Sequence, residues 1–513
     1  MKHKTTTCLL AMLAGSAAVS AESPDWTHTQ LATEFKQMVP RDGGGVIVMG
    51  ETRTEESLSD SDIYVSAIDG DGAVQWSHQW KGQLLGTEPY NGADRFIDAA
   101  VRADGGLAIL ASYLDQDLSG DISNRLTVTQ VDPSGNVIST TDLDWNAGSN
   151  AAVESIQMAM SDDATLLVSR SDSNFSTAAV MSIGSDGLLD WQLDLHDVLV
   201  DASFIRITDL VAGPDGRAML SGEIMRASED RGMLAASINA SGELEWSRIF
   251  STPVVYGLQE GGAAIDQLGN LHVCGDLVNL NFDHTLHVAK INPQGDVLWE
   301  YNLDVEDASF FPSEMAVAEN GNVYVGAHFY EPDGEGSFHG GFHAVALDSE
   351  GQSLWNNATS TIATAWSIQS TGLAVSPDGR VHVYGSGWIA NQNSAHLMTT
   401  WYSDGSIESI EIWNNNPGHE KITDACYDEN NEFYFCGRGE YINFRYSGIV
   451  CHFPDTFCLG DLDQNGAVDV TDLLSMLATF GTDTMPAADL NDDGSVDVSD
   501  LLMLLEYWGG CEA

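Results

Sequence analysis

Short runs of alternating apolar and polar residues fill most of the chain between residues 24 and 453, and a turn bounds each run. In residues 286–291, for example, the apolar Leu286 and Val288 alternate with His287, and the run ends at Asn292-Pro293-Gln294-Gly295. A period of two residues is typical of β-strands with one buried face. Helical periodicity is absent from this pattern, so the sequence predicts an all-β region built from short strands and tight turns.

A pattern of Gly-x-x-x-Trp recurs through this region at intervals slightly above 50 residues. A second recurring element is a hairpin with Asp-Gly or Asn-Gly at its turn, found about eight times, as at Asn320-Gly321 and Asp378-Gly379. Four short strands per unit and this period predict a β-propeller with eight blades, or seven if one unit is irregular. The complete copies of the first pattern are Gly72…Trp76, Gly187…Trp191, Gly242…Trp246, Gly295…Trp299 and Gly351…Trp355, and two copies carry serine, Gly135…Ser139 and Gly405…Ser409.

The eighth unit, residues 423–453, ends before its Gly-x-x-x-Trp strand. The start of the chain supplies a matching segment, because residues 24–29 (PDWTHT) align with residues 74–79 (VQWSHQ). We therefore expect the N-terminal strand to complete the last blade and close the ring, which removes exposed strand edges. Residues 316–326 and 288–299 resemble the SBBP-type bacterial propeller repeat, related to quinoprotein-like propellers, and this resemblance implies a fold without any particular chemistry.

The last fifty residues carry two near-copies of a twelve-residue acidic loop, 28 positions apart. Oxygen ligands recur at positions 1, 3, 5, 9 and 12, a backbone carbonyl is available at 7, and Gly466 and Gly494 occupy the sharp turn at 6. This is the ligand pattern of an EF-hand calcium loop, so the sequence predicts two bound Ca²⁺ ions. The expected ligands are Asp461, Asp463, Asn465, Ala467, Asp469 and Asp472 in the first loop, and Asp489, Asn491, Asp493, Ser495, Asp497 and Asp500 in the second.

An apolar run that predicts one short helix follows each loop, and no helix precedes either loop. Paired half EF-hands of this kind, over residues 458–513, resemble the type I dockerin module. The resemblance implies a calcium-dependent module that binds a cohesin partner and attaches its carrier to an extracellular assembly, often one that degrades polysaccharide. The partner-contact positions would be Val470, Thr471, Val498 and Ser499; the two hydroxyl residues fit the family pattern, and the two valines depart from it.

Cysteines add expectations about crosslinks. Cys458 and Cys511 bracket the small C-terminal module, and we expect a disulfide between them, because so small a core needs staples. In the closing blade, Cys436 is expected to pair with Cys451, with Cys426–Cys436 as the competing choice. Cys274 is expected to be a buried thiol.

Residues 1–21 combine a basic start, a short apolar run and a small-residue exit after Val19, so we expect a secretory signal peptide followed by a propeller over 22–456 and a module over 457–513. The apolar run is too short to span a bilayer. With 76 acidic and 20 basic residues the net charge is −56, which excludes a nucleic-acid partner. We expect a secreted monomer that does not span a membrane.

These features favour a non-catalytic propeller that presents a binding face to a carbohydrate or protein ligand and is tethered by its calcium-loaded tail. The competing hypothesis is a glycoside hydrolase or polysaccharide lyase carried by the propeller, which a group of carboxylates beside an arginine at the channel mouth would favour. A third is that the tail caps its own propeller. The site is expected at the channel mouth or on the long connections 51–62, 113–124, 275–285 and 327–341.

Overall fold

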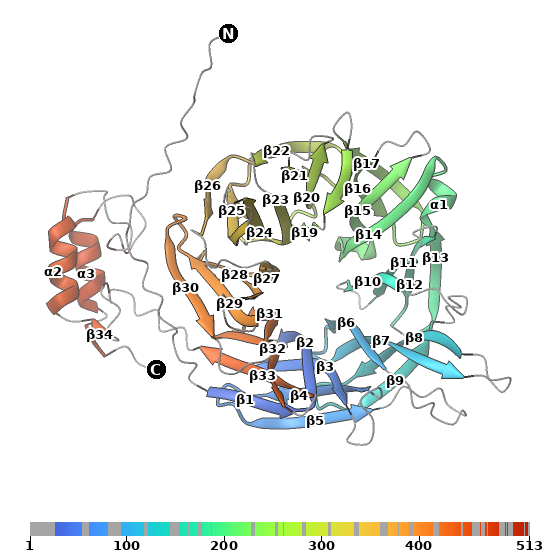
Figure 1. Ribbon diagram of the computed structural model, residues 1–513, viewed down its shortest axis with the longest axis horizontal. Coiled ribbons are helices and arrows are strands. Elements are labelled where there is room, and N and C mark those ends of the chain that lie inside the picture. The colour runs from blue at the N-terminus through green and yellow to red at the C-terminus, as the bar shows by residue number, and fades with distance from the viewer. Residues whose placement is uncertain are drawn as a thin grey trace, which may run out of the picture.

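The computed structural model contains eight antiparallel sheets arranged as blades around a central axis, which confirms the eight-bladed propeller (Figure 1). Its first described residue is Trp26. The structure describes residues 26–453 except for 54–60, 81–93, 117–121, 144–152, 162–164, 173–176, 186, 227–230, 252–254, 260, 280–283, 306–308, 333–337, 360–367, 378, 389–393, 414–419 and 443–444, and then residues 462, 467–468, 470–481, 488, 490, 496–506 and 508–510.

Each of the first four blades is a simple four-stranded meander whose first strand lies nearest the axis. Blade 1 is β2 (Thr33–Pro40), β3 (Val46–Arg53), β4 (Ser61–Ile68) and β5 (Val74–Trp80); blade 2 is β6 (Arg95–Val101), β7 (Leu107–Gln116), β8 (Ile122–Val131) and β9 (Val137–Asp142); blade 3 is β10 (Val153–Met160), β11 (Leu166–Asp172), β12 (Ala178–Ile183) and β13 (Leu189–Asp194), followed by α1 (Leu195–Val198); blade 4 is β14 (Ala202–Ala212), β15 (Ala218–Arg226), β16 (Arg231–Ile238) and β17 (Leu244–Phe250), with η1 (Pro214–Gly216) at its first turn.

Blades 5 to 7 repeat this plan, with one irregularity. In blade 5 the inner strand is split into β18 and β19 around Gly261, where a Cβ would meet the Cys274 carbonyl oxygen at 1.8 Å. Blade 5 is β18 (Val255–Gln259), β19 (Ala263–Ile265), β20 (Leu271–Asn279), β21 (His284–Ile291) and β22 (Val297–Val305); blade 6 is β23 (Ser309–Val317), β24 (Val323–Pro332), β25 (Phe338–Leu347) and β26 (Ser353–Ala358); blade 7 is β27 (Ile368–Val375), β28 (Val381–Trp388), β29 (Ser394–Trp401) and β30 (Ile407–Trp413).

Blade 8 joins the two ends of the propeller, as the sequence predicts. Its inner three strands are β31 (Lys421–Tyr427), β32 (Phe433–Ile442) and β33 (Arg445–Phe453), and its outer strand is β1 (Trp26–Leu31). β1 runs antiparallel to β33, with Trp26 opposite His452 and Leu31 opposite Ser447. The ring is therefore closed by backbone pairing between segments more than 400 residues apart.

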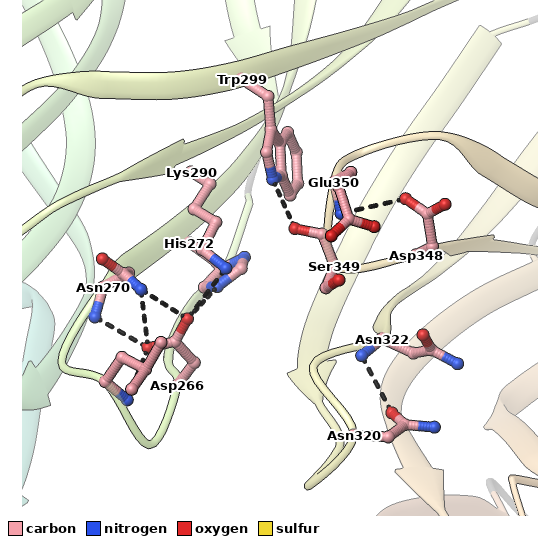
Figure 2. A network of polar contacts seen from close by, with 11 residues as sticks. Asp266, Asn270, His272, Lys290, Trp299, Asn320, Asn322, Asp348, Ser349 and Glu350 are labelled. Atoms are coloured by element: carbon pink, nitrogen blue, oxygen red, sulfur yellow. Dashed lines mark hydrogen bonds and ion pairs between the residues drawn. The ribbon is translucent and has the colours of Figure 1, made fainter.

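The repeated glycine and tryptophan of Gly-x-x-x-Trp form a contact between neighbouring blades. The Trp299 indole nitrogen donates to the Ser349 carbonyl oxygen of the next blade at 3.0 Å (Figure 2). Its ring lies where a Cβ on Gly351 would be, at 2.5 Å, and Gly351 has a φ of +78°, so only glycine fits. Trp26 makes the same contact with blade 1, where it donates to the Gly70 carbonyl oxygen at 2.8 Å.

In the fourth strand of blade 7, Ser409 stands where the other copies of the pattern have tryptophan, and ring closure accounts for the difference. The next blade has no turn between its third and fourth strands, since β33 and β1 come from opposite ends of the propeller. Ser409 therefore has no glycine turn to cover. The other exception has a local replacement, because Thr141 Oγ1 occupies the space beside Gly187.

Many of the short hairpins are held by an aspartate or asparagine at the first position of the turn. The Asp266 carboxylate accepts backbone N–H groups from Leu268 and Asn270, both at 2.9 Å, and an ion pair from Lys290 at 3.0 Å (Figure 2). Burial alone would raise the pKa of Asp266, but the hydrogen bonds from Asn270, Lys290 and His272 outweigh it and hold the pKa well below its usual range. The acidic and amide side chains of these turns therefore stabilise the hairpins.

Apolar side chains fill the space between blades, so the core is a ring of interfaces. One cluster joins Ile63 and Val65 of blade 1 to Leu107 and Ile109 of blade 2, all nearly inaccessible to solvent. Comparable clusters link blades 3 and 4, 5 and 6, and 6 and 7. Burial of this kind is the main term that stabilises the ring.

The C-terminal module contains α2 (Val470–Thr479) and α3 (Val498–Glu506), with a short pairing of β34 (Ala467–Val468) and β35 (Gly509–Gly510). Val468 pairs with Gly509, which follows α3, and the Val496 carbonyl oxygen accepts the N–H of Gly481, which follows α2. The two copies are thus interlocked. A small core of Val468, Met476, Ala488, Val496 and Leu504 lies inside. Among the residues that the structure describes, no helix has the length and apolar character needed to cross a membrane.

The predicted disulfides of the closing blade do not form. Cys274, Cys426, Cys436 and Cys451 are all free thiols. Cys436 lies opposite Val450 across the β32–β33 ladder, so Cys451 is one residue out of register and its side chain points to the other face of the sheet. Cys426 lies opposite Tyr434 and is only a diagonal neighbour of Cys436. Burial of Cys274 is confirmed, and both Cys458 and Cys511 lie outside the described residues.

Candidate functional site

The two sides of the ring differ in their connections. On one side, here called the hairpin side, tight turns join first to second strands in each blade and third to fourth strands in every blade except blade 8. On the other, the connection side, lie the ends of the strands that lead into the longer segments, such as 54–60 and 81–93. The first strand of each blade therefore begins at the connection side, next to the axis. Its first residues surround one end of the central axis, here called the mouth of the channel because propeller blades enclose a central channel.

A group of charged side chains lies at this mouth where blades 8, 1 and 2 meet. It consists of Glu34, Lys36, Glu51, Arg95 and Arg438, here called the mouth cluster. Glu34 and Glu51 are directly opposite each other on β2 and β3. Glu34 is ion-paired with Lys36 at 3.1 Å and with Arg438 of blade 8 at 3.5 Å. Arg95, at the start of β6 in blade 2, is exposed.

The two carboxylates of the mouth cluster have different surroundings. Burial raises the pKa of Glu51, and the neighbouring Glu34 carboxylate raises it further, while Lys36 and Arg95 lower it. The net pKa shift is upward, even though the Phe96 backbone N–H also favours the charged form. Glu34 is instead held between two cations. The two carboxylates therefore sit in different electrostatic surroundings, as the members of acid–base pairs do.

Other blades carry different side chains at the positions equivalent to Glu34 and Glu51 in their first and second strands. Arg206 lies opposite Glu223 in blade 4, Lys421 opposite Arg438 in blade 8, and Phe311 opposite His328 in blade 6. A cavity of about 10 Å³ beside Arg206 and Glu223, between blades 4 and 5, has room for about one water molecule. The charge of the side chains at the mouth therefore differs from blade to blade.

Blade 6 contributes aromatic side chains to the mouth. The rings of Phe311 and His328 are stacked 4.9 Å apart, and Tyr330 packs edge-on against both. Burial lowers the pKa of His328 to about 4. The Ser370 backbone N–H donates to His328 Nδ1 at 3.2 Å, so the neutral ring carries its proton on Nε2. A stacked, neutral aromatic pair of this kind is suited to contact with the apolar face of a sugar ring.

Deeper in the channel lies a ring of four carboxylates, Asp98, Asp209, Glu314 and Asp424, from blades 2, 4, 6 and 8. Each follows an irregularity in its first strand and accepts a backbone N–H from the next blade, with donors at Met158, Ala263, Leu373 and Met38 and distances of 2.7–2.8 Å. Burial raises the pKa of Asp98 to about 7, of Glu314 to about 8, and of Asp209 and Asp424 to about 6. This carboxylate ring joins alternate pairs of blades.

Four of the twelve predicted calcium ligands lie among the described residues. Asp472 and Asp500, at position 12 of the two loops, are fully buried at the starts of α2 and α3. The Asp500 carboxylate accepts backbone N–H groups from Leu490 at 2.8 Å and Asp497 at 2.7 Å. Ala467 lies in β34, and Asp497 precedes α3. The ligands that lie outside the described residues are Asp461, Asp463, Asn465, Asp469, Asp489, Asn491, Asp493 and Ser495.

The donor set of these loops fits calcium on chemical grounds. It is all oxygen and contains several carboxylates, which is what hard divalent cations prefer. A fully buried carboxylate such as Asp472 or Asp500 is costly unless positive charge or hydrogen bonds compensate it. Among the described residues alone, no group of three or more acidic, histidine or cysteine side chains is arranged to hold a metal.

The same two helices leave matching apolar side chains uncovered. Val470 and Val498 are 60% and 59% exposed, and Leu474 and Leu502 are 60% and 63% exposed. Leu477 and Leu505 are likewise matched, at 47% and 48% exposed. Residues i, i+4 and i+7 share one face of a helix, so each helix presents an apolar stripe to solvent. Both predicted contact valines lie in these stripes.

Comparisons with known proteins add nothing to the assignment of chemistry. No protein-family description matches the chain, and no curated protein matches it. Solved structures resemble it in part: a polysaccharide lyase described as an ulvan lyase bound to a GlcA(1-4)Rha3S saccharide is 9% identical, with 83% of this chain and 96% of that chain covered and a TM-score of 0.42.

Two further structures are similar at the same level. A eukaryotic initiation factor is 11% identical, with 82% and 94% coverage and a TM-score of 0.41. An α-L-arabinofuranosidase of Fusarium graminearum in complex with arabinobiose is 11% identical, with 60% and 95% coverage and a TM-score of 0.36. Likenesses this remote carry no argument about function, so the function of this chain has to be inferred from its own geometry.

Proposed function

We propose that this protein is a secreted polysaccharide-active enzyme, a glycoside hydrolase whose catalytic pair is Glu34 and Glu51. A calcium-loaded C-terminal module attaches the enzyme to a partner. The observation that carries the proposal is the pairing of two carboxylates on adjacent strands at the channel mouth, beside Lys36, Arg95 and Arg438. This arrangement favours catalysis over the non-catalytic binding face that the sequence alone favours.

The opposed positions of the two carboxylates allow a retaining mechanism. Directly opposed residues on antiparallel strands have Cβ atoms about 5 Å apart, so both glutamate side chains can reach one glycosidic bond. We assign the retaining scheme, in which the carboxyl groups lie roughly 5 to 5.5 Å apart and the second carboxylate attacks the sugar directly. In this scheme Glu51, whose pKa is raised, is the acid, and Glu34, ion-paired with two cations, is the nucleophile.

The reaction then proceeds in two balanced steps. Glu51 gives its proton to the glycosidic oxygen while a Glu34 oxygen attacks the anomeric carbon; the carbon–oxygen bond breaks, and the leaving sugar departs as an alcohol. The resulting glycosyl ester on Glu34 is hydrolysed by water, whose proton returns to Glu51. The stacked rings of Phe311 and His328 are available to hold a neighbouring sugar residue.

Release of reducing ends from a panel of polysaccharides tests this proposal. Loss of a general acid costs about 10²- to 10⁴-fold in rate, so Glu51→Gln should lower kcat by at least about 100-fold. Glu34→Ala should be inactive and regain turnover with azide, which a purely structural role for Glu34 would not predict. Glu243→Gln, on an exposed hairpin, is the matched control. Full activity in Glu51→Gln, or no cleavage of any polysaccharide, would reject the mechanism.

For the tail we propose a calcium-dependent docking module that binds a cohesin-type partner, with its own propeller as the alternative surface. The support is the pair of matched apolar stripes on α2 and α3, which exposed helices of an isolated module would not keep without a partner. The buried Asp472 and Asp500 explain why the stripes would form only with metal bound, because clustered carboxylates repel one another until a cation neutralises them.

Titration calorimetry of the full chain with Ca²⁺ tests the metal part. We expect two ions per chain, and one ion for Asp500→Asn, since position 12 normally gives a bidentate ligand. Asp197→Asn, exposed after β13, should still bind two. A panel of cohesin domains then tests docking, which should require Ca²⁺ and fail for Leu474→Asp combined with Leu502→Asp, but not for Leu189→Asp on the propeller rim. An unchanged titration after Asp500→Asn would contradict the assignment of the loops.

A further inference from the structure

The positive charge of the mouth cluster is unusual for this chain. Acidic residues outnumber basic ones 76 to 20, and two of the basic residues, Lys2 and Lys4, lie in the expected signal peptide. The mouth cluster nevertheless contains three cations and two carboxylates, and the pKa of one of those carboxylates, Glu51, is raised. Basic side chains therefore outnumber acidic ones within the mouth cluster, in a protein whose net charge is −56.

A second feature adds to this charge. Lys421 and Arg438 are directly opposite each other on β31 and β32. Like charges at opposed positions of an antiparallel pair destabilise the sheet. Arg438 is shared with Glu34 of blade 1, so this pair of cations lies at the edge of the mouth cluster. These two side chains add to the basic residues at the mouth.

The side chains change from basic to carboxylic along the channel. Basic residues of the mouth lie three positions before members of the carboxylate ring in the same first strands, as Arg95 precedes Asp98, Arg206 precedes Asp209 and Lys421 precedes Asp424. An anionic group is attracted by the basic side chains at the mouth and meets no cation in the carboxylate ring. Such a ligand would lie across the mouth without entering the channel.

We propose that the saccharide bound at the mouth is anionic, with a uronate or sulfate group that pairs with Arg95 and with the Lys421–Arg438 pair. This inference rests on the proposed polysaccharide activity and names its substrate class. Arginine binds carboxylate and sulfate oxygens through two parallel N–H groups, so Arg95 is the residue that fixes the orientation of the anionic group. Arg95 and Lys421 are specificity residues in this scheme, and the bond-breaking groups remain Glu34 and Glu51.

Binding measured without turnover tests the inference. The full chain with Glu51→Gln is titrated with matched pairs of polysaccharides: polygalacturonate against its fully methyl-esterified form, and a sulfated galactan against the same galactan after desulfation. We expect the charged member of at least one pair to bind at least tenfold more tightly, and this preference to shrink as salt rises from about 50 to about 500 mM. The pair of polysaccharides that shows the preference identifies the recognised anionic group as a uronate or as a sulfate.

Charge variants then connect the preference to the mouth. Arg95→Gln combined with Lys421→Gln should abolish it, while Arg102→Gln, which removes a cation paired with Asp104 on the hairpin side, should not. Equal binding of charged and neutral members, or a preference that survives the double variant, would overturn the anionic assignment and leave the proposed enzyme intact. No binding of any of the four polysaccharides, together with no cleavage in the wild-type chain, would instead reject the proposed function.

Discussion

At the scale of single residues, the repeated glycines are required for two separate reasons. Gly351 has a φ of +78°, and a Cβ there would meet the Trp299 ring at 2.5 Å. Gly43 has a similar φ of +85°, and a Cβ there would meet nothing within 4 Å. The pair therefore separates the cost of the backbone conformation from the cost of the contact between blades.

We expect Gly351→Ala to lower the free energy of unfolding more than Gly43→Ala does. A left-handed conformation costs a non-glycine residue about 1 to 2 kcal/mol, and overpacking against a fixed ring adds about 1 to 3 kcal/mol. Gly43→Ala should show only the first term. Chemical denaturation of both variants measures the difference. Equal losses in the free energy of unfolding would mean that the Trp299 ring moves aside at no cost in stability.

At the scale of elements, β1 is the part that turns a row of blades into a closed ring. We expect Trp26→Ala to cost about 2 to 3 kcal/mol, less than the roughly 3 to 5 kcal/mol typical of a fully buried tryptophan because its ring is half-buried. It should also raise hydrogen exchange at the amides of β1 and β33 selectively, since no covalent link holds β1 to its neighbour. Native-state exchange by mass spectrometry reads this out.

Trp355→Ala provides the matched control for β1. Trp355 makes the same contact, donating to the Ser403 carbonyl oxygen at 2.8 Å beside Gly405, but its strand β26 is continuous with the rest of blade 6. Its loss should destabilise the protein by a similar amount and leave exchange in β1 and β33 unchanged. If both variants open the closing blade equally, ring closure does not depend on Trp26.

The same scale shows what the sequence could predict. Blade count and closure followed from the Gly-x-x-x-Trp spacing and from the likeness of the segments around Trp26 and Trp76, because a repeated contact leaves a repeated signature. The disulfide predicted in the closing blade was wrong because register decides pairing: Cys436 and Cys451 are one position out of register, and a one-residue shift reverses the face of the sheet. The calcium loops remain a prediction, and eight of their twelve ligands lie outside the described residues.

The mouth cluster was not predicted, and the reason is distance along the chain. Glu34 and Arg438 are 404 residues apart and meet only because β1 closes the ring. Blade 1 supplies three members and blades 2 and 8 supply one each, so no local motif marks them. A usable signal was present three positions before the ring carboxylates, where Arg95, Arg206, Phe311 and Lys421 align, and at the equivalent Glu34 of blade 1, three positions before Gln37. Seeing this column requires the strand register.

At the scale of the whole molecule, the carboxylate ring should make stability depend on pH. Burial raises the folded-state pKa of Asp98 to about 7 and of Glu314 to about 8, well above the usual value near 4 in an unfolded chain. The folded state therefore binds more protons between these limits. Its extra stability is fully present below about pH 4 and is lost as the pH rises through about 6 to 8. The falling net negative charge towards the pI of 4.1 acts in the same direction.

Asp98→Asn separates the ring from the general charge effect. The variant loses one hydrogen bond, because the two carboxylate oxygens accept N–H groups from Ala99 and Met158 respectively, and an amide has only one accepting oxygen. Its stability should therefore be lower at about pH 5.5 but should fall less between about pH 5.5 and pH 8.5, since one titrating group is gone. Denaturant unfolding at saturating Ca²⁺ and several pH values measures this slope. Asp197→Asn, exposed and outside the ring, should keep the wild-type slope, and an unaltered slope in Asp98→Asn would mean that the ring does not set the pH dependence.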